Sequence, residues 1–235
     1  MRLRVLSWNL KHGRSMPPAG RDLLPEFTAA LREWDWDVAL LQEVPPWWPR
    51  SLADSLDSEE RTVLTSRNGW LALRQAVATR WPDVIKSNGG GANAIVVRAD
   101  RIATHRHARL CRLPERRWVQ GVRLGCGIWV ANLHATVHND EAAKRDGRLA
   151  AATALGWAAG EPLVLGGDFN VREPSFDALE HAGGNDVDHV FVSGLTVRGS
   201  ATVLERGPLS DHAPVVVAVE WEGRDPEPGE PDASD

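Results

Sequence analysis

The sequence predicts an α/β fold in which two β-sheets pack face to face and the helices lie outside them. Three observations lead to this prediction. Short apolar segments typical of strands clearly outnumber the two or three segments with helical periodicity. Strands and helices do not alternate strictly, as they would in a fold built on one parallel sheet. No internal repeat or linker interrupts the chain, so we expect residues 1–221 of the 235 to form one domain.

The first elements follow from apolar spacing. Residues 3–8 alternate between apolar and polar side chains and predict a strand. Residues 21–34 carry apolar side chains at helical spacing. The continuous apolar run 38–41 is typical of a strand buried on both faces, and it stops before the pair Pro45-Pro46.

The middle of the chain contains a helix, a turn and a strand. Residues 69–80 predict a helix that ends at Trp81-Pro82, because the residue before a proline disfavours helical backbone. The glycine-rich residues 88–91 predict a turn that leads into a strand at 94–97.

One further helix and six further strands complete the domain. Asn139 can cap a long helix that runs to residue 159, where Gly160 is a typical C-terminal stop. The apolar segments predict strands at residues 110–113, 118–124, 128–133, 162–165, 188–192 and 214–219.

Composition excludes several classes of protein and mechanism. Hydrophobic residues make up 43% of the chain and charged residues 25%, which excludes a disordered or collagen-like protein. There are 11 Trp but no Tyr, so no mechanism that needs a phenol can operate. No apolar run reaches the roughly 18 residues of a membrane-spanning helix, and the N-terminus lacks the apolar core of a secretory signal. Since Cys111 and Cys126 can form at most one bridge, we expect free thiols and a cytoplasmic location.

Charge is distributed unevenly along the chain. The formal net charge is −5, and residues 222–235 account for all of it, with six acids against Arg224. This segment is also rich in proline, so we expect a disordered acidic tail. In contrast, residues 101–123 hold seven arginines and one acid, Glu115. This pattern fits either a solvated strand face or a surface that meets phosphate, because arginine binds phosphate oxygens bidentately.

Two groups of oxygen-bearing side chains follow apolar strands. Asn9 ends the first strand and Glu43 follows the second, and such oxygens suit Mg²⁺. Asp168 and Asn170 follow another strand and a pair of glycines that allow close backbone approach. A turn-forming Asn, a solvated Glu and an Asx turn are the plain structural alternatives.

Two histidines also occupy positions at strand ends. His212 lies beside Asp211 at the entrance to the last strand and is a candidate general base. Asp188 could hold its imidazole in one tautomer, as the acid of a catalytic triad does. His134 and Asn132 point to the same face of one strand, so both could reach one ligand. A surface Asp-His pair and a buried core histidine are the alternatives.

Taken in this order, these segments resemble the endonuclease/exonuclease/phosphatase superfamily of metal-dependent phosphoesterases. This superfamily includes pancreatic-type deoxyribonuclease, abasic-site endonucleases, neutral sphingomyelinases and inositol polyphosphate 5-phosphatases. The resemblance covers residues 3–220, and its most specific elements are Gly-Asp-Phe-Asn at 167–170 and Ser-Asp-His at 210–212. It implies a deoxyribonuclease-like four-layer α/β/β/α sandwich of two mixed β-sheets with helices outside.

The resemblance also implies a metal site. Glu43 is expected to be the principal ligand of Mg²⁺, with Mn²⁺ as an alternative ion. Asn9 is expected close to that ion and Asp211 near it. Phosphoryl transfer mainly needs positioning and charge neutralisation, which a metal and nearby donors supply.

The remaining catalytic roles are carried over residue by residue. Asp168 is expected to orient or deprotonate the attacking water, and Asn170 to hold the phosphate or a second metal. His212 is expected to act as base or to stabilise the transition state, with Asp188 supporting it. His134 is expected to donate to the phosphoryl oxygens.

Departures from the family pattern leave the substrate open. Lys11 stands where several DNA-repair members place an acid or amide. The segment of Asn132 and His134 is similar to the deoxyribonuclease and sphingomyelinase branches. Arg117 resembles a family position near the site, so Asn132 and Arg117 are the expected substrate-binding residues. No motif of the 5-phosphatase branch is found.

We therefore expect a monomeric, metal-dependent phosphodiester hydrolase whose substrate is DNA or RNA. The second hypothesis is a phosphatase or phosphodiesterase that acts on a small molecule or a lipid head group. A third, catalytically silent binding protein, is disfavoured because the polar set is complete. The balanced charge of residues 1–221 weakens the nuclease hypothesis, and the arginines of residues 101–123 partly restore it.

Overall fold

Two β-sheets form the centre of the molecule in the computed structural model, which describes residues 1–66, 68–81, 83, 91–113 and 115–222. One sheet has seven strands and the other has six. In spatial order the first contains β11 (Thr196–Val197), β13 (Val215–Glu220), β1 (Arg2–Asn9), β2 (Val38–Val44), β4 (Gly91–Val97) and β3 (Glu59–Thr65), and β12 (Thr202–Val203) also pairs with β13. The second contains β5 (Ile102–Cys111), β6 (Arg117–Leu124), β7 (Trp129–His134), β8 (Leu163–Asp168), β10 (Asp188–Ser193) and β9 (Glu180–Asn185).

Each sheet contains one parallel pair of strands, and all other pairs are antiparallel. The parallel pairs are β1 with β2 and β7 with β8. A helix connects the two strands in both cases, namely α1 (Leu24–Glu33) and α4 (Asp140–Ala158). The side chain of Asn139 accepts a hydrogen bond from the amide of Ala142 and caps α4, as the sequence predicts. The carboxyl ends of a parallel pair lie at the same edge of its sheet, so each pair brings two strand ends together.

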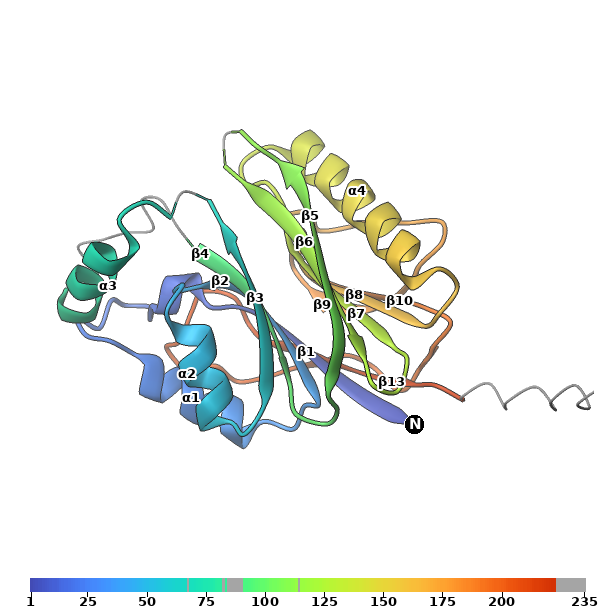
Figure 1. Ribbon diagram of the computed structural model, residues 1–235, viewed down its shortest axis with the longest axis horizontal. Helices are drawn as coiled ribbons and strands as arrows, with labels where there is room; N and C mark the ends of the chain where they lie inside the picture. Colours follow the sequence, from blue (N-terminus) through green and yellow to red (C-terminus); the bar gives the residue numbers. More distant parts are fainter. Residues whose placement is uncertain (67, 82, 84–90, 114, 223–235) are drawn as a thin grey trace, which may run out of the picture.

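Apolar side chains fill three layers between and outside the sheets. One layer lies between the two sheets and includes Val5, Val38, Val130 and Val190. A second lies between the seven-stranded sheet and the outer helices α1 and α2 (Trp48–Ser55), and a third lies under α4. Figure 1 shows the sheets face to face, with α1 and α2 outside one and α4 outside the other. The predicted four-layer sandwich is therefore confirmed.

Some predicted elements differ from the observed ones. Only residues 110–111 of the strand predicted at 110–113 lie in a strand, at the end of β5. This strand starts at Ile102, and its exposed Arg and His side chains conceal the alternation. β3, β9, β11, β12 and α2 were not predicted, and the described residues contain four α-helices, including α3 (Leu71–Arg80). The predicted turn at 88–91 lies outside the described residues except for Gly91.

The chain ends lie side by side. The N-terminal amine donates to the carbonyl oxygen of Trp221 over 2.7 Å, and the Trp221 amide donates to the carbonyl of Met1. The predicted tail, apart from Glu222, lies outside the described residues. Cys111 and Cys126 are free, as expected. Within the described part of the chain, no helix is both long enough and apolar enough to cross a membrane.

Candidate active site

The ends of the two parallel strand pairs meet at one end of the sandwich. Asn9 and Glu43 lie at the ends of β1 and β2, and His134 and Asp168 end β7 and β8. The register places His134 directly opposite Asp168. Ligands of α/β proteins commonly bind outside the carboxyl ends of parallel strands. The arrangement thus brings four of the predicted site residues together from both sheets.

Asp168 lies at the centre of this group. Its side chain is almost completely buried, yet it lines the cleft. Its two oxygens accept hydrogen bonds from the Asn9 amide group and the Asn170 backbone amide, each over 2.9 Å. Burial, followed by the charge of Asp188, raises the pKa of Asp168 to about 7. Its carboxyl group can therefore exchange a proton near neutral pH.

His212 forms a pair with Asp188. The His212 Nδ1 atom lies 2.7 Å from Asp188 Oδ2, and Nε2 lies 3.9 Å from Asp168. Burial favours the neutral imidazole, but the hydrogen bond and charge of Asp188 outweigh it and raise the pKa of His212 to about 9. The histidine thus carries a positive charge at neutral pH and faces the cleft with Nε2.

Two contacts fix the position of His212. The indole nitrogen of Trp8 donates to the His212 carbonyl oxygen over 3.0 Å. The hydroxyl of Ser210 accepts from the His212 amide and donates to the carbonyl of Asn9. The Ser-Asp-His segment is therefore attached to the end of β1, where the metal ligands are expected.

A backbone irregularity aims Glu43 into the cleft. β2 continues through Glu43 to Val44, instead of ending before it, and its register with β4 shifts between Leu41 and Val44. Glu43 has a positive φ of 49°, which is unusual for a residue with a side chain. Bulges of this kind often redirect a side chain at an active site.

Glu43 faces two histidines. Its carboxylate lies 3.0 Å from His12 Nε2 and 3.7 Å from His134 Nε2. Burial opposes ionisation, but the hydrogen bond and charge of His12 outweigh it and hold the pKa of Glu43 well below its ordinary value. Glu43 is therefore a full negative charge in the cleft.

Sequence reasoning missed His12. It lies in the short 3-10 helix η1 (Lys11–Gly13), which follows β1 directly. The available signal was the absence of apolar side chains at residues 11–15, although the sequence alone gave a reason to single out only Lys11. Lys11 itself pairs with Asp211 over 2.6 Å. Both partners line the cleft, so Asp211 lies beside the other predicted site residues.

His134 is held as a neutral donor. Arg117 lies with one guanidinium nitrogen 3.0 Å from His134 Nδ1 and another 2.8 Å from Glu115. Burial, followed by the Arg117 charge, lowers the pKa of His134 well below its ordinary value. Its Nε2 atom lies 3.6 Å from Asp168. Arg117 lines the cleft, and its observed contact orients His134.

Asn132 lies elsewhere than expected. It is fully buried between the sheets and does not line the cleft. Its amide nitrogen donates to the carbonyls of Leu41 and Ala94, and its oxygen accepts from Gln42. These contacts use the polar atoms of Asn132 inside the core, so this side chain joins the two sheets beneath the site. It is therefore not available to bind a substrate in the cleft, contrary to the prediction.

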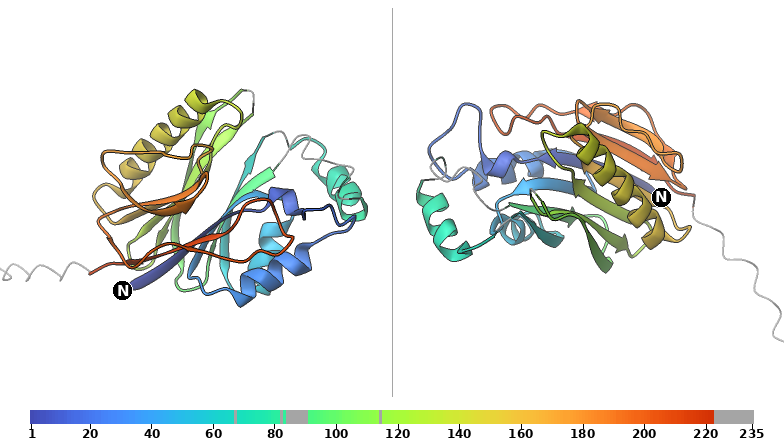
Figure 2. Two further views of the ribbon diagram at one scale, coloured as in Figure 1. Left: turned by 180° about the vertical axis from the view of Figure 1, so that it is seen from behind. Right: turned by 90° about the horizontal axis from the view of Figure 1, so that it is seen from above.

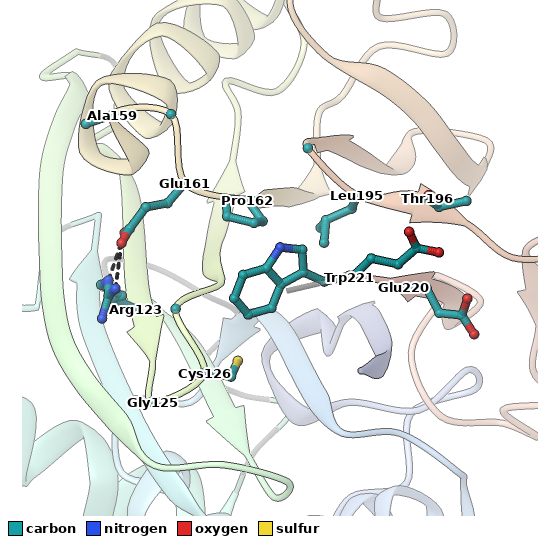
Figure 3. A pocket seen from close by; sticks show the side chains of 14 residues that line it. Arg123, Gly125, Cys126, Ala159, Glu161, Pro162, Leu195, Thr196, Glu220 and Trp221 are labelled. Atoms are coloured by element: carbon teal, nitrogen blue, oxygen red, sulfur yellow. Dashed lines mark hydrogen bonds and ion pairs between the residues drawn. The ribbon is translucent and has the colours of Figure 1, made fainter. Parts of the chain in front are cut away.

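The cleft has a volume of about 490 Å³. Asn170 lies at its edge with positive φ, and its side-chain amide donates to the carbonyl of Ala135. A larger cavity of about 750 Å³ lies around Trp221 at the chain ends (Figure 3). That cavity is lined by the ion pair of Arg123 with Glu161 and by none of the predicted site residues.

The donor set of the cleft fits a hard divalent cation. Glu43 and Asp168 both lie within 3.7 Å of the same His134 nitrogen, and Asn9 donates to Asp168. Asp211 adds a further carboxylate, so the available ligands are oxygens, which Mg²⁺ and Mn²⁺ prefer. Asp168, Asp188 and His212 also bring possible ligand atoms within 4.8 Å of one another.

Comparisons with known proteins match this chain to one family. The model of the Endonuclease/Exonuclease/phosphatase family matches residues 6–212. A protein of that description from Bacteroides vulgatus has 17% identity and a TM-score of 0.72, with 94% of this chain and all of that chain covered. One from Beutenbergia cavernae has 20% identity and a TM-score of 0.72, with 94% of this chain and 72% of that chain covered.

A third solved structure carries a more specific description. The mannosyl-6-phosphatase of Bacteroides thetaiotaomicron has 18% identity and a TM-score of 0.69, with 93% of this chain and all of that chain covered. A search of curated proteins found no match. At these identities the solved structures establish a shared fold, and the family match establishes the predicted resemblance.

Proposed function

Because this chain belongs to the Endonuclease/Exonuclease/phosphatase family, we propose that it is a metal-dependent phosphodiester hydrolase whose substrate is nucleic acid. The family is one of phosphoester hydrolases, which gives the reaction class. One observation carries the finer proposal. A buried carboxylate, Asp168, lines one cleft together with the carboxylate of Glu43 and with His212, which pairs with Asp188 behind it.

The proposed roles of the side chains follow from their charge states. Asp168 orients the attacking water and accepts its proton, since its pKa of about 7 suits a general base at neutral pH. His212, held cationic by Asp188, stabilises the charge that develops on the phosphoryl oxygens. Neutral His134 donates a hydrogen bond to the same group, with its ring held by Arg117.

Glu43, Asn9 and Asp211 would hold the divalent cation. When bound, such an ion supplies positive charge to the phosphoryl oxygens and to the leaving oxygen. Glu43 is suited to this role because it stays ionised in a half-buried position. Mg²⁺ and Mn²⁺ both prefer oxygen ligands, so both belong in the assay.

The charge balance of the cleft favours a diester over a monoester. Two cationic side chains that line it already face an acid, since Lys11 faces Asp211 and Arg117 faces Glu115, and the His12 ring likewise faces Glu43. A phosphomonoester brings about two negative charges at neutral pH, and a diester brings one. A cleft whose cations are largely neutralised therefore suits the singly charged substrate better.

A small phosphomonoester is the second candidate. It is supported by the modest volume of the cleft and by the likeness to a mannosyl-6-phosphatase. The two candidates predict opposite preferences between bis-p-nitrophenyl phosphate and p-nitrophenyl phosphate.

The test compares these two esters with plasmid DNA and RNA in Mg²⁺, in Mn²⁺ and in excess EDTA. We expect hydrolysis of the diester and of nucleic acid, and loss of both in EDTA. Glu43→Gln should raise the metal concentration for half-maximal activity by about 10–100-fold or more. Glu180→Gln, an exposed carboxylate on β9, is the matched control. Full activity in EDTA would contradict metal dependence, and hydrolysis of the monoester alone would contradict the diester proposal.

A further inference from the structure

Strand β5 forms the edge of the six-stranded sheet and is unusually basic. Arg106 and Arg109 are exposed on it, and Arg112 and Arg116 are exposed in the connection to β6. Among the described residues, none of the ion pairs involves these four arginines. This contrasts with the cleft, where Lys11 and Arg117 are each paired with an acid. The edge therefore carries positive charge that protein groups do not neutralise.

Arg109 lies among aromatic rings on one face of the edge, whereas Arg106 lies over the Trp129 ring on the other face, 5.5 Å from its centre. The Arg109 guanidinium lies 5.9 Å from the centre of the Trp118 ring, which is half-buried. The His107 ring contacts the same indole edge-on at 5.4 Å, and His105 lies 5.7 Å beyond it. Basic and aromatic side chains in alternation are the usual surface of proteins that bind single-stranded nucleic acid.

This basic edge leads to the cleft. Arg116 is followed by Arg117, which lines the cleft and contacts His134. A second hollow of about 540 Å³, lined in part by Leu113, lies beside the cleft and shares Glu115 and Arg117 with it. Figure 1 shows the hairpin of β5 and β6 extending to the end of the sandwich at which the site residues lie. Figure 2 shows the same hairpin from behind and from above.

We propose that a single-stranded nucleic acid binds along the β5 edge, with its phosphates on Arg109 and Arg112 and a base against Trp118, and that this surface delivers one phosphodiester to the cleft. The proposal rests on the proposed function for the reaction itself. An extended backbone from His105, past His107 and Arg109, to Arg112 spans about 23 Å, enough for several phosphates of one nucleic-acid strand. Charged side chains also protect edge strands from aggregation. That role does not require a tryptophan beside the arginines, and it does not require the basic edge to lead into the cleft.

Binding can be measured without turnover. Fluorescence anisotropy of labelled oligothymidylate and oligouridylate, recorded in EDTA over a range of salt concentrations, gives the dissociation constant and its salt dependence. Each phosphate contact contributes about 0.7 to the log–log slope for a single strand. The double variant Arg109→Ala/Arg112→Ala should therefore lower the slope by about 1.4. The matched control is Arg2→Ala/Arg50→Ala, which removes two exposed arginines from other parts of the molecule.

The tryptophan is tested in the same way. Trp118→Leu should weaken binding by about tenfold or more, since stacking on an aromatic ring contributes to each bound base. Trp70→Leu is the control, because Trp70 is 83% exposed on a different face of the fold, beside α3. All four variants should hydrolyse bis-p-nitrophenyl phosphate at the rate of the unmodified protein, which shows that the cleft is intact.

The outcomes separate this inference from the proposed function. An unchanged salt slope in the double arginine variant would overturn the binding surface, whatever the diesterase activity is. Equal affinity for duplex DNA or for polyglutamate would also overturn it, because the site would then respond to charge alone. If bis-p-nitrophenyl phosphate is not hydrolysed but the variants lose oligonucleotide binding, the surface stands and the proposed reaction fails.

Discussion

Replacing Gly167 by alanine should damage both the stability and the site of this protein. Gly167 lies in β8 directly opposite Leu133 of the parallel strand β7, with φ of 139°. A Cβ atom at this position would collide with the carbonyl oxygen of Leu133 and lie 3.0 Å from its carbonyl carbon and amide nitrogen. These are backbone atoms of a central strand, so no side-chain rotation can relieve the contact.

The expected cost combines two effects. Overpacking in a well-filled interior costs about 1–3 kcal/mol, and an unfavourable backbone conformation adds about 1–3 kcal/mol. The free energy of unfolding should therefore fall by about 2–6 kcal/mol. For a domain of this size the melting temperature changes by about 2–4 °C per kcal/mol, so a decrease of about 4–24 °C is expected.

The site should change as well, because Gly167 and Leu133 immediately precede Asp168 and His134. The 3.6 Å approach of the His134 ring to the Asp168 carboxylate depends on the spacing of β7 and β8. Turnover of bis-p-nitrophenyl phosphate, measured well below the melting temperature, should fall by about 10²-fold, since a displacement near 1 Å can cost that much.

Calorimetry or denaturant unfolding measures the stability, and Gly156→Ala is the control. Gly156 is exposed on α4 and has no neighbouring atom within 4 Å of an added Cβ, so alanine there should be neutral or stabilising by up to about 1 kcal/mol. A Gly167→Ala protein that melts with the unmodified chain would refute the steric reasoning. If stability falls but turnover is unchanged, the spacing of the two strands does not control the site.

Three further predictions concern other parts of the chain. His212→Ala should lower turnover by about 10²–10⁴-fold and Asp188→Asn by less, and the double variant should be little worse than His212→Ala alone; additive losses would mean that the two side chains act separately. Deletion of residues 223–235 should leave the melting temperature and turnover unchanged, and a marked loss of either would show that the tail stabilises the domain. Burial raises the pKa of the Cys126 thiol, so it should react with iodoacetamide more slowly than a cysteine in a short peptide; an equal rate would show that the thiol is open to solvent.

Much of the site could be predicted because its residues lie at strand ends. A strand that is buried on both faces, such as β2 or β8, is recognisable as an apolar run, and the first polar residues after it are conspicuous. This position at a strand end identifies Asp168, Glu43 and His134 as candidate site residues. Their convergence follows from topology, since two parallel pairs direct their carboxyl ends to the same end of the sandwich.

The parts that could not be predicted depend on tertiary context. β5 is an exposed edge, so its Arg and His side chains give no period-two pattern of apolar residues. Alternation placed Asn132 on the same face as His134, but it could not show that the opposite sheet covers Asn132 and leaves His134 at the cleft. His12 could not be predicted, because its position at Glu43 depends on a left-handed backbone turn that no local apolar pattern indicates.

The hydrogen bond from the Trp8 indole to the carbonyl of His212 closes a loop of 204 residues. Contacts between positions so distant in sequence form late in folding, because the entropy of closing the loop must be offset before they contribute. Asn9 and His212 can face each other only after β13 has joined β1, which requires nearly the whole domain to be synthesised and collapsed. An incomplete or partly folded chain should therefore be inactive even where its first sheet has begun to form. During refolding, catalytic activity should recover later than tryptophan fluorescence reports burial of the indole rings. The interval between the two signals measures how long β13 takes to pair with β1.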